Sequence, residues 1–548
     1  MDEEQQQRET VAGTVDYRRR PAIRSKHGRW VSAWFLIWVE IAESIAFNGI
    51  SGNLMIYLTD KLGESTSSAA TNINAWKGVG FILPIFGATI ADAWVGKYYT
   101  IVVSCIIYIL GLALLTFSTA IPSLSKGGSH ELTLQKAVFF SALYLVAIGR
   151  GGRGPCVQAF GADQFDGDHA REKKAKSSFF NWWNFGTSVG ALLGLVVLSY
   201  IEDNLSWGLG FGIPFIIMVF GSLLFLLGTI TYRFPIKVET ESPFRRIGRV
   251  FGRAAKNRNL DLPYPAQQGR QQLRQLRFLD KALLVRDGDV AACNEGEVEE
   301  AKAVLRLLPI WAMSFVLAIV FAQSGTLYIK QGNTMDRSIG KLKVPAAALQ
   351  GVMAVTMLII VPIYDKLCVP AIRRLTGKPN GITTLQRIGV GLFITIMTMA
   401  VSAIVEAKRL QIAVRHGLID LPDATVPMSI WWLLPQFVLF GFTVLFALVG
   451  LQEFFYDQVP GELHSVGLAV TSTIQGLGFF LCSFLVSFVT KASTIGGRES
   501  WISDNINRSH LDYFYWLLAG ITTVDLVIFI YFANSYKYYK RQGSAETE

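Results

Sequence analysis

A helix needs about 20 apolar residues to cross the roughly 30 Å hydrocarbon core of a bilayer. Runs of that length recur along this chain, from residue 31 to residue 533. Their number, about twelve, predicts an all-α membrane protein. The predicted spans are residues 31–57, 76–94, 100–120, 137–159, 179–200, 211–232, 304–325, 346–363, 388–405, 431–450, 468–489 and 513–532.

Composition supports this class of protein. Hydrophobic residues make up 51% of the chain and charged residues 17%, with a mean hydropathy of +0.36. These values argue against a soluble multidomain enzyme of this size. The formal net charge is +10, but the basic residues gather in particular loops. We therefore expect a lipid bilayer and no nucleic acid as partner.

The Lys and Arg residues concentrate in alternate connections between the predicted spans. Clusters lie at residues 18–24, 97, 171–176, 245–258, 373–374 and 537–541, whereas residues 122–131 and 420–427 carry little positive charge. Because Lys and Arg favour the cytoplasmic ends of spans, both termini are expected in the cytoplasm. The polar N-terminal residues predict no cleavable signal peptide.

A polar stretch of mixed charge divides the chain into two halves. We predict a cytoplasmic tail at 1–30, a six-helix bundle at 31–232, a cytoplasmic linker at 233–303, a second six-helix bundle at 304–535 and a cytoplasmic tail at 536–548. Residues 298–308 have helical spacing. A solvated linker is favoured there over a helix on the membrane surface.

Cysteine and histidine positions predict no disulfide, metal site or cofactor. None of the five cysteines forms a C-x-x-C pair, and all six histidines fall in tails and loops. A metal centre or a histidine proton relay at mid-membrane is therefore disfavoured.

The two halves repeat weakly at the ends of the second and eighth spans. Gly87, Asp92, Gly96 and Lys97 form a pattern typical of the major facilitator superfamily, and Asp365 takes the corresponding place in the second half. Two parallel six-helix halves imply alternating access. Because an Asp at a helix end can cap a neighbouring helix in one state only, these residues are predicted to act as a conformational latch. An ordinary polar turn is the alternative.

Longer motifs resemble a known family over nearly the whole chain. They are FNGISGNL at 47–54, ADAWVG at 91–96, FGADQFD at 160–166, FNWWN at 180–184, KQG at 330–332, GITTLQRIG at 381–389, GLQEFFY at 450–456 and HLDYFYW at 510–516. They are similar to those of the plant nitrate/peptide transporter family, within the proton-coupled oligopeptide transporters. The resemblance implies a twelve-helix major facilitator fold and movement of small solutes, commonly with protons.

The chain departs from the family pattern at two cations. The first-helix motif E-x-x-E-[K/R] is matched by Glu40 and Glu43, but Ser44 occupies the basic position. The fourth helix has Gly154 where relatives usually carry a Lys. Arg150 and Arg153 are predicted to be the substitute partners of the two acids, with Arg150, one turn away, reaching toward the vacated position.

Two interpretations of the first-helix acids stay open. Glu40 and Glu43 are three residues apart and share a helix face. A carboxylate in a low-dielectric site must be paired or protonated, which is what a proton carrier requires. A fixed ion pair between the first and fourth helices is the alternative.

Other substitutions favour an anionic solute. Val444 stands where many relatives carry a pocket carboxylate, and Phe321 replaces the His of several nitrate-carrying relatives. With no carboxylate at Val444 to engage a peptide amino group, and with Arg able to bind a carboxylate or nitrate in a bidentate way, an anion is favoured over a peptide. The further cavity candidates are Phe47, Asn48, Gln323, Gln436 and Thr443.

The predicted function is therefore secondary transport of a small anionic solute, of the nitrate or carboxylate hormone class, by alternating access. Proton symport is favoured over a facilitative carrier, a di- or tripeptide transporter and a membrane sensor that does not transport. An enzyme is disfavoured. We expect a monomeric transport unit in the plasma membrane or the vacuolar membrane.

Overall fold

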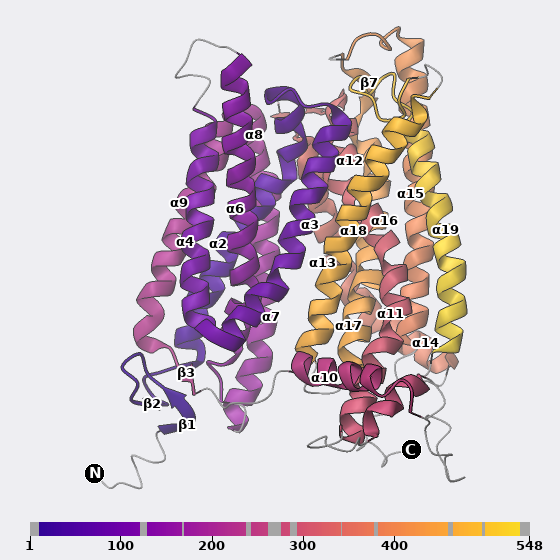
Figure 1. Ribbon diagram of the computed structural model, residues 1–548. Helices are drawn as coiled ribbons and strands as arrows, with labels where there is room; N and C mark the ends of the chain where they lie inside the picture. The colour runs from indigo at the N-terminus through magenta and orange to yellow at the C-terminus, as the bar shows by residue number, and fades with distance from the viewer. Residues whose placement is uncertain are drawn as a thin grey trace.

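Two helical bundles lie side by side in this computed structural model, and strand β1 and the final turns of helix α19 lie at the same end (Figure 1). The structure describes residues 10–120, 129–166, 169–236, 243–260, 276–284, 293–340, 342–376, 382–422, 424–458, 464–495 and 499–536. The end that holds β1 is called the terminal end below. The charge asymmetry of the loops predicts that it faces the cytoplasm.

The first bundle is built from six long helical segments. They are α2 (Arg29–Ile56) with η1 (Tyr57–Lys61), α3 (Thr66–Ile90) with η2 (Ala91–Val95), α4 (Lys97–Ser118), α6 (Ser129–Ala162), α7 (Ala170–Leu193) with η3 (Gly194–Leu198) and α8 (Ser199–Asn204), and α9 (Trp207–Leu227) with η4 (Gly228–Thr231).

The second bundle repeats the arrangement. Its segments are α11 (Glu295–Ala322) with η7 (Gln323–Gly325) and α12 (Leu327–Asn333), η8 (Ala346–Leu349) with α13 (Gln350–Ile363) and η9 (Tyr364–Cys368), α15 (Thr384–Arg415), η10 (Ile430–Leu433) with α16 (Leu434–Thr443), η11 (Val444–Leu448) and α17 (Val449–Asp457), α18 (His464–Ser493), and α19 (Leu511–Ser535).

Helix length and apolar character agree with the predicted membrane fold. In the part of the chain that the structure describes, ten helices are long and apolar enough to cross a bilayer. Helix α6, which carries Arg150 and Arg153, and the segment around α13 complete the two sets of six. The expectation of about twelve spans in two six-helix halves is confirmed.

Short elements lie at the ends of the bundles. At the terminal end, β1 (Thr10–Val15) pairs with β2 (Pro21–Ile23) and β3 (Phe234–Pro235) in one antiparallel sheet. Helix α14 (Val369–Thr376) follows η9. The remaining strands are β4 (Met335–Asp336), β5 (Ser338–Ile339), β6 (Leu342–Lys343) and β7 (Val426–Ser429).

Charged hydrogen bonds hold the sheet against the first bundle. The fully buried Arg233 donates to Glu172 at 2.7 Å and to the carbonyl oxygen of His27 at 2.9 Å. Arg24 donates to Glu172 and to Asp166. Burial alone would raise the pKa of Glu172, but hydrogen bonds from Arg233 and from the Asp166 amide, with the charge of Arg24, hold it below its ordinary value. The tail, α7 and the end of α9 are therefore fastened together.

The polar stretch between the bundles contains helices. Helix α10 (Pro243–Lys256) lies across the terminal end of the second bundle (Figure 1) and packs with η6 (Arg277–Leu283) through Val250, Leu279 and Val298. The expectation that residues 298–308 form a solvated linker is wrong, because they belong to α11. Asn294 and Glu297 start that helix as a capping box, which moves its beginning outside the apolar run.

Glycines allow the helices of the first bundle to approach closely. A Cβ atom at Gly87 of α3 would lie 2.5 Å from the Gly151 carbonyl oxygen and 2.6 Å from the Gly152 Cα of α6. A Cβ atom at Gly194 would lie 2.5 Å from the Ile45 carbonyl oxygen of α2. These contacts place α3 and α7 directly against the helices that carry the candidate site.

The close contact at Gly87 predicts a difference between two helical glycines. Gly87→Ala should lower the melting temperature of the detergent-purified protein, because overpacking costs about 1–3 kcal/mol. Gly154→Ala is the matched control, since no other helix or loop of the described residues places a heavy atom within 4 Å of its Cβ position. Thermal unfolding followed by tryptophan fluorescence measures both variants. Equal melting temperatures for the two variants would contradict the packing role of Gly87.

Candidate functional site

Helices α2 and α6 bring two acids and two arginines together inside the first bundle. Glu40 and Glu43 are three residues apart on α2, and Arg150 and Arg153 are three apart on α6, so each pair shares one helix face. The two faces meet. We call these four residues the charge cluster.

Arg153 is at the centre of the charge cluster. Its side chain is fully buried, and Nη1 donates to Glu40 Oε2 at 2.8 Å while Nη2 lies 3.2 Å from Glu43 Oε2. A buried guanidinium needs such partners, because an unpaired charge in a low-dielectric interior is costly. Arg153, which is next to Gly154 in the sequence, is the cation that contacts both acids.

Arg150 is more exposed and less tightly held. About a quarter of its side chain is exposed (25%), and its Nε lies 3.2 Å from Glu43 Oε1. Its Cζ atom lies 3.3 Å from the ring centroid of Phe47, which in turn stacks on Trp76. The guanidinium therefore rests on an aromatic face, a contact that holds a cation without neutralising it.

The two positions where the family cations are missing lie apart from these contacts. Ser44 donates to the Thr187 carbonyl oxygen at 2.7 Å and so faces α7. Apart from the glycine itself, its chain neighbours and the nearby backbone of α6, no heavy atom of the described residues lies within 4 Å of the Cβ position of Gly154. The expectation that Arg150 reaches toward this position is wrong, because its side chain extends instead to Glu43 and Phe47.

The other cavity candidates divide between different environments. Asn48 donates to the Ser44 carbonyl oxygen, Gln323 donates to the Ile319 carbonyl oxygen and Cys482, and Thr443 accepts from Thr395. Phe321 packs edge to face with Phe440, Gln436 is fully buried, and Val444 begins a turn of π-helix. In the contacts found among described residues, Phe47 is the candidate that touches the charge cluster.

The predicted latch residues lie at the terminal end. Asp92 and Asp365 each fall second in a five-residue π-helical turn, η2 and η9, so the weak repeat has a structural counterpart. The side chains of these two residues lie outside the described part. Gly96 adopts φ +86° where η2 meets α4, and Lys97 Nζ donates to Asp163 at 2.6 Å within the first bundle.

Polar contacts close the two bundles against each other at the end opposite the termini. Arg337 pairs with Asp203 at 2.6 Å, Lys330 pairs with Asp60 at 3.1 Å, and Asp504 accepts from the Thr66 amide at 2.7 Å. Farther along α3, Asn74 donates to Cys482 of α18, and Phe81 stacks on Phe479. By the predicted topology, the bundles are closed on the outer side.

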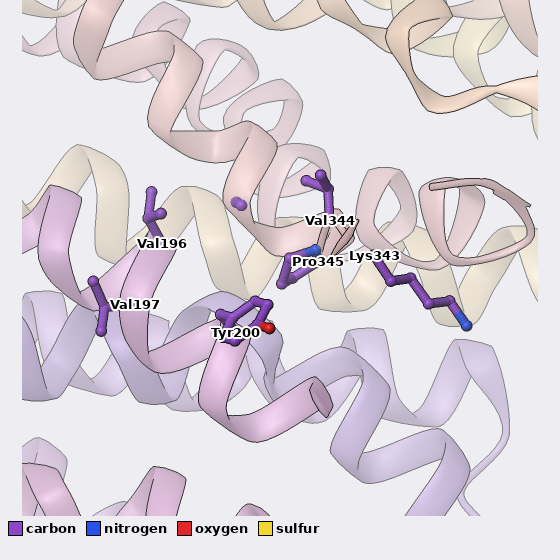
Figure 2. A pocket seen from close by; sticks show the side chains of 7 residues that line it. Val196, Val197, Tyr200, Lys343, Val344 and Pro345 are labelled. Carbon is purple, nitrogen blue, oxygen red and sulfur yellow. The ribbon is translucent and has the colours of Figure 1, made fainter. Parts of the chain in front are cut away.

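A groove lies at the same junction but away from the charge cluster. It encloses about 310 Å³ and is lined by Val196, Val197, Tyr200, Lys343, Val344, Pro345 and Ala348 (Figure 2). Its walls come from η3 and α8 on one side and from β6 and η8 on the other. None of the predicted site residues lines this groove.

The sequence reasoning missed three buried charged residues, two inside predicted spans and one two residues beyond the end of a predicted span. Lys77 lies in the middle of α3, Glu202 in α8 and Asp525 in α19, and all are buried. Each interrupts an apolar run, which marks an intramembrane ionisable residue as a functional candidate. Lys77 was overlooked because the predicted second span begins at residue 76, whereas α3 begins at Thr66.

A protein-family model described as the POT family (PTR2) matches residues 98–502. The chain belongs to the POT family. It is 53% identical over 538 residues to Protein NRT1/PTR FAMILY 5.10 of Arabidopsis thaliana, covering 96% of both chains. It is 48% identical over 548 residues to Protein NRT1/PTR FAMILY 5.12 of the same plant, covering 97% of this chain and 96% of that one.

Solved POT family structures have the same fold. An auto-inhibited POT family peptide transporter gives a TM-score of 0.72 at 21% identity, covering 94% of this chain and 99% of that one. PepTSo gives 0.71 at 20% identity, covering 92% of this chain and 98% of that one. The predicted family, the major facilitator fold and a membrane transporter rather than an enzyme are confirmed.

Within this POT family site, the two arginines should differ in their effect on stability. Arg153→Gln leaves two buried carboxylates without their common partner, and breaking a buried ion pair costs about 3–5 kcal/mol. Arg150→Gln should have a smaller effect, because Glu43 keeps its contact with Arg153. Thermal unfolding of the two purified variants compares them directly. An equal loss of stability would show that Arg153 is not the structural centre.

Proposed function

We propose that this chain transports a small anionic solute by alternating access, with a proton carried on Glu43. The observation that carries the proposal is the unequal pairing of the two acids. Glu40 accepts a 2.8 Å hydrogen bond from the fully buried Arg153, whereas both contacts of Glu43 are 3.2 Å long. Glu43 is therefore the acid that can exchange its partners for a proton.

Protonation of Glu43 changes what Arg150 can bind. A neutral carboxylic acid no longer attracts the guanidinium, and Arg150 is the exposed cation of the charge cluster. An anion then replaces the carboxylate as the partner of Arg150. Because one proton and one negative charge enter together, the net charge of the charge cluster and its bound anion stays the same. This exchange couples the movement of the solute to the movement of the proton.

An anion fits this site better than a peptide. Val444 offers no carboxylate to a peptide amino group, and the planar guanidinium of Arg150 matches a carboxylate or a nitrate in a bidentate geometry. Nitrate and carboxylate hormones are therefore the solute classes that we propose. We further propose a monomeric transport unit in the plasma membrane or the vacuolar membrane.

The closed outer end supplies the second requirement of alternating access. The Asp203–Arg337 and Asp60–Lys330 ion pairs join the bundles on the side opposite the termini. Breaking these pairs while the terminal end closes would expose the site to the other side.

A facilitative carrier is the second candidate. It is favoured by Ser44 and Gly154, which stand where family cations are missing, and by the tight Glu40–Arg153 contact. In that case the charge cluster would be a fixed structural element, and flux would follow the solute gradient alone.

Uptake by cells that express the Glu43→Gln or the Glu40→Gln variant distinguishes a proton symporter from a facilitative carrier. We expect wild-type uptake to rise as the external medium becomes acidic, and Glu43→Gln to lose both this dependence and uphill accumulation. Glu40→Gln is the matched change one turn away, and it should retain a dependence on pH while lowering the amount of folded protein. Labelled nitrate, indole-3-acetate and dialanine would be compared at acidic and neutral pH, with surface expression measured in parallel.

Three results would contradict the proposal. Wild-type anion uptake that ignores pH would establish the facilitative carrier, and uptake of dialanine alone would establish a peptide transporter. Binding of an anion without any flux would instead indicate a sensor.

A further inference from the structure

Lys77 is a buried cation that the charge cluster does not neutralise. It lies in the middle of α3 with only 9% of its surface exposed. Among the described residues it makes no hydrogen bond or ion pair. Lys302, which is also buried, pairs with Asp280 at 2.6 Å and with Glu299 at 2.9 Å. An unpaired buried ammonium is costly, so the Lys77 environment calls for an anion.

The tip of Lys77 reaches the boundary between the two bundles. A Cβ atom at Gly325, in η7 of the second bundle, would lie 2.6 Å from Lys77 Nζ and 3.6 Å from Gln350 Oε1. Gln350, at the start of α13, donates to the Gly52 carbonyl oxygen of α2 at 3.2 Å. The ammonium group therefore lies beside a hydrogen bond that joins the halves, and the absence of a side chain at Gly325 leaves room for it.

Lys77 and Arg150 lie on the same side of α3. Phe81 is one helical turn from Lys77 and shares its face. The Arg150 Cζ atom lies 5.5 Å from the Phe81 ring centroid, and Lys77 and Arg150 are close enough for their charges to repel. Lys77 and Arg150, two cations of like charge, therefore lie on the side of α3 that carries Phe81, where both can contact one small anion.

We propose that Lys77 is the anchoring cation of the solute site, where its Nζ binds the anionic head of the solute while Arg150 binds it from the first bundle's interior. This rests on the proposed anion transport and adds the residue that anchors the solute. Glu40 and Glu43 pair with Arg150 and Arg153, which leaves the charge of Lys77 in excess. A bound anion offsets that charge, whereas a neutral solute does not.

The position of Lys77 also links binding to the contact between the halves. An anion held by Lys77 lies next to Gly325 and Gln350, which belong to the second bundle, while Arg150 and Lys77 belong to the first. Binding therefore screens the repulsion between the two cations on one side and adds a contact across the boundary on the other. Both effects depend on the ammonium group.

Three variants test this assignment. Lys77→Met removes the charge at similar length, Lys77→Arg keeps it, and Gly325→Ala keeps the charge but displaces the tip. Lys343→Met, at an exposed position in the groove of Figure 2, is the control for loss of one positive charge elsewhere. Labelled nitrate and indole-3-acetate are the transport probes, and sodium nitrate and sodium indole-3-acetate are the ligands in thermal-shift measurements on the purified protein.

Lys77→Met should raise KM for the transported anion at least about tenfold, as expected for loss of one charge-assisted hydrogen bond, and should abolish the thermal shift. Lys77→Arg should retain most of the affinity, Gly325→Ala should weaken it, and Lys343→Met should resemble the wild type. If the wild-type protein transports the anion and folded Lys77→Met shows an unchanged KM and thermal shift, the assignment of Lys77 is overturned while the proposed function stands. If the wild-type protein neither transports nor binds either anion, the proposed function fails, and this inference fails with it.

Discussion

The first bundle depends on the pairing of two carboxylates with two guanidinium groups inside the membrane. Neither Glu43 nor Arg153 has enough exposed surface to be stabilised by water, so each requires the other helix. This requirement places α2 against α6 in one rotational setting, with Glu40 and Glu43 toward Arg150 and Arg153. A different rotation of either helix would leave a buried charge without a partner.

Small residues make that setting possible. Gly194 lets η3 approach the backbone of α2, and Gly87 of α3 meets Gly151 and Gly152 on α6. In lipid there is little hydrophobic driving force between helices, so close backbone contact and internal ion pairs must hold them together. The same α3 that packs on α6 through Gly87 carries Lys77 and Phe81 toward the second bundle. The packing of α3 within the first bundle therefore determines that Lys77 and Phe81 lie at the boundary between the bundles.

The two cations of the charge cluster both come from α6. Ser44 and Gly154 have no charge, and Ser44 is turned toward α7. Arg153 takes the structural part by holding both acids, whereas Arg150, resting on Phe47, stays partly exposed. In the proposed mechanism, Arg153 remains fixed while Arg150 exchanges partners. The outer ion pairs Asp203–Arg337 and Asp60–Lys330 then hold the bundles in the state described here.

Sequence alone determined the membrane class, the number of spans, the family and the acids of the first helix. These features depend on apolar run length, on local motifs and on the high energetic cost of a charge in lipid, and all of these are properties of short segments. The start of α11 was missed because a capping box at Asn294 extends the helix beyond its apolar run. Tertiary structure alone decided that Arg153 contacts both acids and that Lys77 lies beside Gly325. It also decided that no neighbouring helix of the described residues occupies the space beside Gly154. Those facts depend on the rotation and separation of helices far apart in the chain, which side-chain packing sets and local periodicity does not.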